Sequence, residues 1–345
     1  MIKKITGLAL ALVLLLSSLA GCGAADNKTE KNVDGKLQII ATIFPEYDWV
    51  KNILGENPAG AETTLLLNNG VDLHSFQPTA ADIMKISECD LFIYVGGESD
   101  EWVEDALKEA VNKDMVVINL LESLGTRAKE EEIVEGMEHE HDEEDHEHEE
   151  EHADEEHEGE EHEHEEAELD EHVWLSLQNS SVLVEGISEA LQKIDPDHAE
   201  EYKKNTEAYL AKIAELDQKY QAAVSAGRVS TVLFGDRFPF RYLTDDYGLS
   251  YYAAFSGCSA ETEASFETVA FLSEKLQELG LEAVLTIEGT DHGIAETIIG
   301  NTAEKDQKVL VLDSMQSTTE EDIKAGASYL GIMEKNLEVL KEALQ

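Results

Sequence analysis

Short apolar runs alternate with amphipathic stretches through the first third of the chain. Apolar runs bounded by polar residues are typical of strands buried on both faces, and apolar spacings of three and four are typical of helices. The pattern predicts strands at 37–43, 62–67, 91–95 and 115–120 and helices at 47–54, 80–87 and 101–111. Strands that alternate with helices form a parallel sheet covered by helices on both faces. Residues 37–195 are therefore expected to form an N-terminal α/β lobe.

The same alternation returns in the last third of the chain. It predicts strands at 229–234, 250–255, 283–287 and 308–312 and helices at 266–279, 294–303 and 322–344. Residues 228–345 are therefore expected to form a second α/β lobe with the same kind of sheet.

A long helical pattern separates the two halves. It opens at Pro196 and stops at Gly227, as helices commonly do at these residue types. Its apolar residues recur mostly at steps of three and four: Tyr202, Tyr209, Ile213, Leu216 and Tyr220. The predicted fold class is α/β, with two lobes that each contain a mostly parallel sheet flanked by helices and are joined by one long rigid helix at 196–227.

The first residues have the pattern of an export signal. Lys3 and Lys4 precede an apolar stretch at 5–16, which is followed by small residues. A positive start, a short apolar core and small residues are typical of a secretory signal peptide, and the apolar stretch is too short for a comfortable membrane span. We predict a signal peptide at 1–21.

The end of this segment indicates a lipid anchor. Residues 19–22 (LAGC) resemble the bacterial lipoprotein signal, in which the cysteine is lipidated and becomes the new N-terminus. We therefore expect lipidation at Cys22, stable anchoring to the cell membrane outside the cytoplasm, and a polar, flexible tether at 22–36. An uncleaved anchor and a plain secreted protein are the alternatives.

The tract 138–166 differs in composition from the rest of the chain. Its 29 residues comprise 19 Asp or Glu, 8 His, one Ala and one Gly. It has almost nothing apolar to bury, so we predict a disordered insertion within the first lobe. A solvated acidic linker is the simpler interpretation, but the interleaved histidines favour weak binding of cations at many sites.

Charge limits the class of partner. The chain has 25 Lys and Arg against 75 Asp and Glu, a formal net charge of −50. Such a polyanion repels nucleic acid and anionic lipid, so neither nucleic-acid binding nor docking on a membrane by basic patches is expected. Cations are the expected ligands.

Two histidines outside the tract occupy positions typical of ligand sites. His74 follows the second predicted strand in a loop rich in Gly, Asn and Pro, and His172 follows the tract immediately before an apolar segment. Ligands of open α/β sheets lie beyond the carboxyl ends of the strands, and imidazole is a preferred donor for zinc. From position alone, two ordinary loop histidines are the favoured interpretation. His198, in the polar start of the long helix, is interpreted as a surface residue.

Several segments resemble one protein family in order and spacing. Residues 70–78 (GVDLHSFQP) look like the first metal-ligand segment of the zinc/manganese family of ABC-transporter substrate-binding lipoproteins, and 170–175 (DEHVWL) look like its second, with Glu171 where the family usually has Pro. Gly96-Gly97 with Glu101-Trp102, residues 256–265 and residues 311–314 resemble further family segments. The tract between the two histidine segments is typical of the zinc branch.

The resemblance implies a ligand set. It carries over His74 and His172 as imidazole ligands and Asp313 as a carboxylate ligand from the second lobe. The family's third ligand, His or Glu, follows the first strand of that lobe, but Gly235 stands there in this chain. The adjacent Asp236 is the first substitute, although it is equally able to pair with an arginine.

Two further residues are alternatives for the third ligand. Cys258 lies in a strand-to-helix loop and would bind as a thiolate, and His292 also follows a predicted strand. Besides Cys22, the cysteines are Cys89 and Cys258; in an exported protein they either pair or stay free. A small buried residue is the favoured interpretation of Cys89.

The expected function is to capture zinc, with manganese as the alternative, and to deliver it to the permease of an ABC importer. The protein is expected to act as a monomer. A surface metal buffer or adhesin that meets no transporter fits the composition equally well. A zinc metallohydrolase would need an open coordination position and a base such as Glu288 or Asp291. The chain has no GxSxG motif and, outside the acidic tract, no HExxH motif, so we do not expect an enzyme.

Overall fold

Two four-stranded parallel sheets form the framework of residues 36–137, 168–259 and 263–345, which the computed structural model describes. The first has the order β2-β1-β3-β4 and the second the order β6-β5-β7-β8. Their strands are β1 (Gln38–Ala41), β2 (Glu62–Leu65), β3 (Leu91–Tyr94), β4 (Val116–Asn119), β5 (Thr231–Arg237), β6 (Ser250–Phe255), β7 (Ala283–Ile287) and β8 (Lys308–Leu312). The predicted α/β class with two parallel sheets is confirmed, and the three last strands lie at their predicted bounds.

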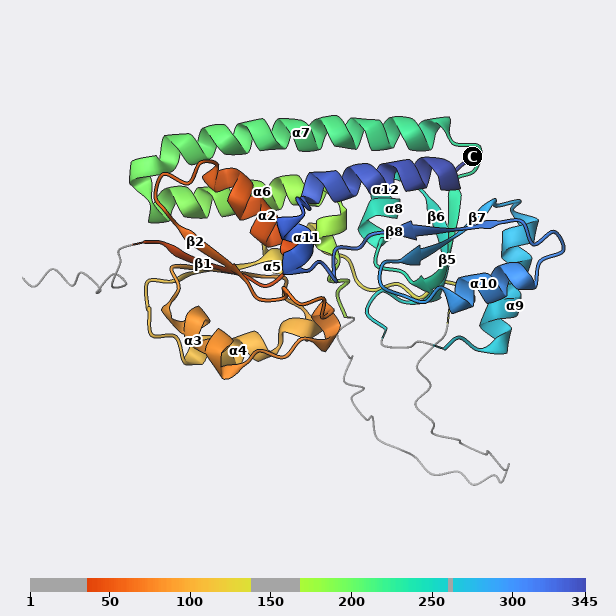
Figure 1. Ribbon diagram of the computed structural model, residues 1–345, viewed down its shortest axis with the longest axis horizontal. Helices are drawn as coiled ribbons and strands as arrows, with labels where there is room; N and C mark the ends of the chain where they lie inside the picture. The colour runs from red at the N-terminus through yellow and green to blue at the C-terminus, as the bar shows by residue number, and fades with distance from the viewer. Residues whose placement is uncertain (1–35, 138–167, 260–262) are drawn as a thin grey trace, which may run out of the picture. The chain divides into compact units, whose positions relative to one another are not determined.

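Helices cover both faces of each sheet (Figure 1). The first half contributes α2 (Phe44–Leu54), α3 (Ala80–Glu88), α4 (Trp102–Lys108), α5 (Leu120–Leu124) and α6 (Leu177–Ile194). The second half contributes α7 (Ala199–Ala226), α8 (Arg241–Tyr247), α9 (Phe266–Glu278), α10 (Gly293–Gly300), α11 (Glu320–Lys324) and α12 (Tyr329–Ala343). Single 3-10 turns are η1 (Leu73–Ser75), η2 (Glu98–Asp100), η3 (Gly125–Arg127), η4 (Val173–Leu175) and η5 (Pro196–His198).

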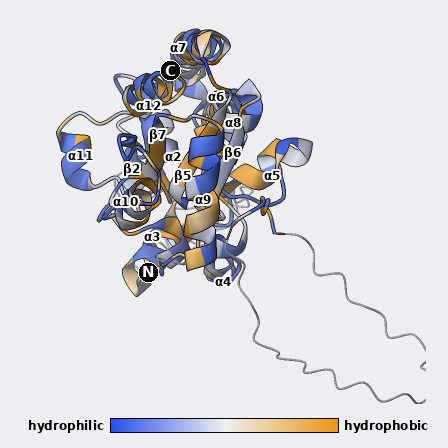
Figure 2. Ribbon diagram, turned by 90° about the vertical axis from the view of Figure 1, so that its right-hand side faces the viewer, coloured by the Kyte–Doolittle hydropathy of each residue, from blue (hydrophilic) through white to orange (hydrophobic). Residues whose placement is uncertain are grey.

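The long helix is α7, which spans 28 residues. It packs against α2 and α6 beside the first sheet and against α12 and α8 beside the second. Figure 2, which views α7 nearly end-on, shows that it contains both hydrophobic and hydrophilic residues, as expected of a helix with one buried side. The predicted start at Pro196 is a separate 3-10 turn, because Pro196 to His198 form η5 before the α-helix begins at Ala199.

Helix α6 was not anticipated from the sequence. Ser176 caps its first turn by accepting a hydrogen bond from the Asn179 amide, and the helix runs antiparallel to α7 in close contact with it. The signal was present, because Leu183, Ile187 and Leu191 recur at steps of four and are buried. Helix α6 packs against α7 on the side of the first sheet, and α7 is the helix that packs beside both sheets.

The predicted helix at 322–344 is two helices. α11 ends at Lys324, and α12 starts at Tyr329 after Gly326, whose φ of 98° does not fit a helix. Ser328 caps the second helix by accepting a hydrogen bond from the Gly331 amide. The break lets Tyr329 enter the core, where its hydroxyl donates to the Trp174 carbonyl at 2.8 Å.

One hydrophobic cluster extends through both sheets. It includes Ile39 and Phe92 of the first sheet and Phe234 and Leu285 of the second, all of them buried. A smaller cluster lies between the second sheet and helices α9 and α10. The described residues 36–345 accordingly form one compact unit, so the two sheets are fixed to each other by a shared core.

Several predictions fall on residues that the structure does not describe. The signal peptide at 1–21, the lipidated Cys22, nearly all of the tether at 22–36 and the tract at 138–166 lie outside the described residues. Among the described helices, none is long and apolar enough to cross a membrane.

Candidate metal centre

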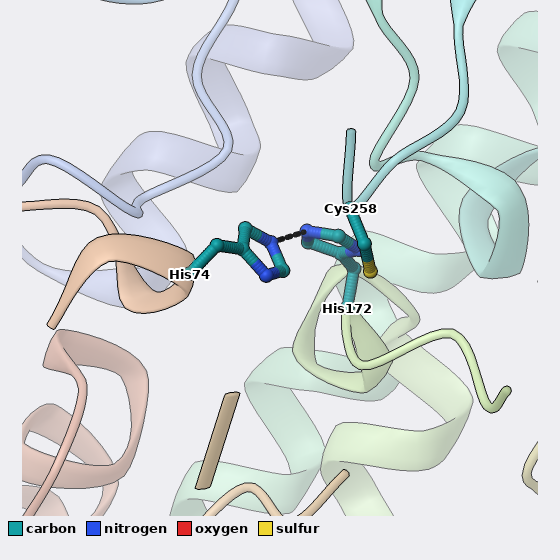
Figure 3. A group of neighbouring side chains, drawn as sticks. All are labelled: His74, His172 and Cys258. Carbon is teal, nitrogen blue, oxygen red and sulfur yellow. Dashed lines mark hydrogen bonds between the residues drawn. The ribbon is translucent and has the colours of Figure 1, made fainter. Parts of the chain in front are cut away.

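Three side chains bring potential metal-ligand atoms together at the carboxyl ends of the strands. They are His74, His172 and Cys258, and one donor atom from each lies within 4.8 Å of the other two. The Nε2 atoms of the two histidines are 3.2 Å apart. In Figure 3 the rings point at each other, and Cys258 reaches them from a third segment. The structure thus juxtaposes the two histidines that the sequence singled out.

The spacing fits a tetrahedral zinc site. Zinc bonds of about 2.0–2.1 Å to nitrogen and about 2.3 Å to sulfur imply ligand atoms roughly 3.3–3.6 Å apart. The separation of 3.2 Å between the two Nε2 atoms is close to that value.

His74 is held by the turn η1. The Asp72 carboxylate caps this turn by accepting a hydrogen bond from the His74 amide, and it also forms an ion pair with Arg237 at 2.7 Å. On the ring, Nδ1 lies 2.8 Å from the Ser99 hydroxyl and 3.5 Å from Oε2 of Glu171. Because Nδ1 faces Ser99 and Glu171, the other ring nitrogen, Nε2, faces His172.

His172 is oriented by a carboxylate two residues before it. Asp170 accepts hydrogen bonds from the amide and from Nδ1 of His172, at 2.9 and 3.0 Å. A carboxylate only accepts, so the proton of the neutral ring lies on Nδ1 and Nε2 keeps its lone pair for a metal. The ring is fully buried and therefore has a single well-defined orientation.

The two histidines differ in their affinity for protons. Burial and the neighbouring His172 ring lower the pKa of His74 to about 3. Burial acts in the same direction on His172, but the hydrogen bond and charge of Asp170 outweigh it and raise the pKa of His172. His74 is thus a neutral ligand at physiological pH, as metal binding requires.

Glu171 connects the two histidine segments. Its Oε1 accepts a hydrogen bond from the Ser99 amide at 2.8 Å, and its Oε2 has no hydrogen-bond partner within the described part of the chain. A side chain at Gly97 would collide with it, because an added Cβ would lie 2.4 Å from Oε1. The Gly-Gly segment noted in the sequence therefore leaves room for this carboxyl group. In the sequence, Glu171 stands out only as a difference from the Pro that the resemblance implies. Its approach to His74 is visible only in the structure.

Cys258 follows β6 in a loop that comes close to His172. A Cβ on Gly257 would lie 3.1 Å from Cε1 of His172, so glycine permits the approach. The Cys258 amide donates to Oε1 of Glu131 at 2.9 Å. Burial raises the pKa of the thiol, and the charge of Glu131 adds to the shift. Cys89 is also a free thiol and is buried elsewhere, so the two cysteines do not pair.

Asp236 is not part of the three-residue group. Its carboxylate accepts hydrogen bonds from the backbone amides of Arg237 and Ile287 and from the Thr290 hydroxyl. The arginine beside it pairs with Asp72 instead, so the predicted alternative of a pair with Arg237 is not realised through that side chain. The carboxylate of Asp236 is engaged in holding the ends of β5 and β7 together.

Two other predicted residues also lie outside the group. Asp313 accepts a hydrogen bond from the Met315 amide at the end of β8, and burial raises its pKa. His292 places Nδ1 at 3.0 Å from the Thr286 hydroxyl. Glu288, considered as a base, has both oxygens bonded to the backbone and hydroxyl of Ser314.

The family of the chain follows from comparison with known proteins. Residues 39–343, which include both sheets, match the family described as zinc-uptake complex component A, periplasmic. The chain belongs to this family. Membership confirms the resemblance seen in the histidine segments and the assignment to the zinc branch.

Two curated relatives illustrate the similarity. The high-affinity zinc uptake system protein ZnuA of Bacillus subtilis is 30% identical over 346 residues, which cover 100% of this chain and 99% of the relative. The zinc-binding lipoprotein AdcA of Streptococcus pneumoniae is 33% identical over 330 residues. The match covers 95% of this chain but only 60% of AdcA, so the chain spans about three fifths of that longer relative.

A solved structure confirms the fold. The Zn(II)-bound ZnuA-like domain of Streptococcus pneumoniae AdcA superposes with a TM-score of 0.66 at 28% identity, covering 90% of this chain and 99% of that domain. Two parallel sheets with flanking helices are therefore the family's architecture as well as this chain's.

Proposed function

We propose that this protein captures one zinc ion between His74 and His172 and delivers it to an ABC importer. The observation that supports the proposal is the 3.2 Å approach of the two Nε2 atoms, with each ring's Nδ1 occupied by a partner. Relatives named for zinc binding and zinc uptake agree with it. Capture needs no chemistry on a substrate, and we propose no catalytic activity.

Zinc is preferred to manganese because the donor atoms are imidazole nitrogens. Borderline ions such as zinc prefer imidazole, whereas manganese prefers carboxylate and carbonyl oxygen. Asp313 remains a proposed carboxylate ligand from the second sheet. It would supply one of the four ligands that zinc usually binds.

The place of action is proposed to be the outer side of the cell membrane. The protein would be a monomer held by a lipid at Cys22, with the importer's permease as its partner. The tract at 138–166 would raise the local zinc concentration near the tight site through weak binding. Release would need only small movements, since α6 and α7 pack together and the shared core resists wide opening of the two sheets.

The decisive test is competitive zinc titration of the full mature chain against a chelator. His74→Ala and His172→Ala should each lower the affinity of one tight site by at least about 100-fold, because loss of a mere outer partner already costs about 10- to 100-fold. His198→Ala is the matched control, since the His198 ring is hydrogen-bonded to Asp195 in the turn before α7 and is not one of the three grouped residues, so zinc affinity should not change. Tight binding that survives both substitutions would refute the proposed site.

A further inference from the structure

The position of the family's third ligand is closed to any side chain in this protein. At Gly235, an added Cβ would lie 2.7 Å from Cα and 2.9 Å from N of Ala295, which belong to the backbone of α10. Contacts this short require the helix to move away from β5. A histidine or glutamate could not stand here unless α10 were packed differently, so the third donor has to come from another segment.

Two residues that could replace this third ligand already make hydrogen bonds within the protein. Asp236 accepts three hydrogen bonds and is buried between β5 and β7. His292 is held with its Nδ1 between the hydroxyls of Thr286 and Thr290. Neither of these two residues belongs to the group of ligand atoms.

The loop after β6 brings a sulfur atom to the histidine pair instead. Cys258 is the third member of the group, with a donor atom within 4.8 Å of those of both histidines. Two independent features allow the loop to lie beside the histidine pair and fix it in that position. Glycine at 257 permits close contact with the His172 ring, and the Cys258 amide is bonded to Glu131 of the first half of the chain.

We infer that Cys258 supplies a thiolate as the third ligand, giving a site with two imidazole nitrogens and one sulfur. The inference rests on the proposed function and adds to it the basis of metal selectivity. When zinc binds, the S–H bond breaks, a Zn–S bond forms and the proton passes to solvent. Thiolate is a soft ligand that selects zinc and disfavours manganese. A site with this sulfur discriminates against manganese more strongly than one with a carboxylate at the same place.

Cobalt(II) provides a direct readout of the sulfur ligand. One equivalent of Co²⁺ added to the full mature chain should produce a sulfur-to-cobalt charge-transfer band, because cobalt takes zinc's tetrahedral place. Cys258→Ser should abolish the band and lower zinc affinity at least about 10-fold, the smallest loss expected when even an outer partner is removed. Cys89→Ala is the matched control, since that thiol lies in the core, and it should keep both the band and the affinity.

A second variant tests selectivity. Cys258→Asp replaces the soft donor by a hard one, so the ratio of zinc to manganese affinity should fall at least about 10-fold. Circular dichroism of each variant establishes that it is folded. If the wild type binds zinc tightly, shows no sulfur band and loses no affinity in Cys258→Ser, the inference is overturned while the proposed function stands. If the wild type has no tight site, the proposed function itself is wrong.

Discussion

At the scale of single residues, the site depends on groups that fix the protonation of the ligands. Asp170 accepts a hydrogen bond from Nδ1 of His172, and Oε2 of Glu171 lies 3.5 Å from Nδ1 of His74. Such carboxylate partners set the tautomer and raise the basicity of a metal-binding histidine.

Substitution of Glu171 by Gln tests this role. An amide nitrogen placed near Nδ1 of His74 would favour the tautomer whose proton lies on Nε2, which cannot bind a metal. We expect zinc affinity to fall about 10- to 100-fold in competitive titration, with unchanged stoichiometry. Glu122→Gln, on an exposed residue of α5, is the control. An affinity equal to wild type would show that Ser99 alone orients His74.

A buried acid in the first turn of α2 makes stability depend on pH. Oε2 of Glu46 accepts hydrogen bonds from the amides of Thr42 and Ile43. Burial raises the pKa of Glu46 from 4.5 to about 8, and the charge of Asp100 adds to the shift. The folded state therefore keeps a proton that the unfolded chain loses near pH 4.5. The stability due to this proton is complete below that pH and is lost as the pH rises towards about 8.

Glu46→Gln should remove this dependence. The difference in unfolding free energy between the variant and the metal-free wild type should grow by about 1.4 kcal/mol per pH unit from about pH 5 to about pH 8. Urea unfolding at several pH values measures it, and comparison with wild type cancels the other buried acids. Glu122→Gln again serves as the control and should show a constant difference. A constant difference for Glu46→Gln as well would mean that Glu46 is ionised in the folded protein.

At the scale of elements, the contact between α10 and β5 decides which residues can reach the metal. Gly235 allows the helix backbone to approach the strand, and β5 is irregular from Phe234 to Arg237 in its pairing with β6. This contact leaves no room for a side chain at position 235. In our proposal the third donor therefore comes from the end of the neighbouring strand β6.

Gly235→Ala should expose the strength of this contact. The added methyl group overlaps the α10 backbone, so we expect a loss of about 1–3 kcal/mol in urea unfolding. Gly186→Ala is the matched control: it lies on an exposed part of α6 with nothing within 4 Å of the added Cβ. It should stabilise the protein by about 0.5–1 kcal/mol, the usual gain for this change inside a helix. Equal effects of the two substitutions would contradict the packing argument.

At the scale of the whole described chain, the two sheets share one core and are bridged by side-chain hydrogen bonds. Nε1 of Trp174 donates to the Ser314 carbonyl after β8, and Tyr220 of α7 donates to the Met333 carbonyl of α12. Because the two sheets share this core, unfolding of either one would remove packing partners of the other. We therefore expect the described residues to unfold as one cooperative unit.

This expectation is testable because all three tryptophans, Trp49, Trp102 and Trp174, precede the second sheet in the chain. Tryptophan fluorescence and far-ultraviolet circular dichroism should give the same urea midpoint. Leu285→Ala, in the buried β7, should destabilise the fold by about 2–5 kcal/mol and shift both midpoints equally. A tryptophan midpoint that does not move would mean that the two sheets unfold separately.

Much of the framework could be predicted from the sequence because strands buried on both faces leave continuous apolar runs. Three strands of the second sheet were placed at their observed bounds, and α6 was missed although its apolar spacing was regular. The break between α11 and α12 was missed because Gly326 and Ser328 sit within an otherwise helical pattern. Single turns such as these depend on local backbone angles that periodicity does not reveal.

By itself, the sequence determined the two parallel sheets, the long helix and the pair of histidines, because these follow from periodicity and from recognisable segments. The tertiary structure alone decided which third donor meets them. It brings Cys258 to the two histidines, and not Asp236, the neighbour of Gly235. The grouped residues are separated by up to 184 positions, from 74 to 258, and only packing brings them together. Separation along the chain does not determine distance in space. Here the close contact of α10 with β5 and the glycine beside Cys258 determine which side chains can approach the histidines.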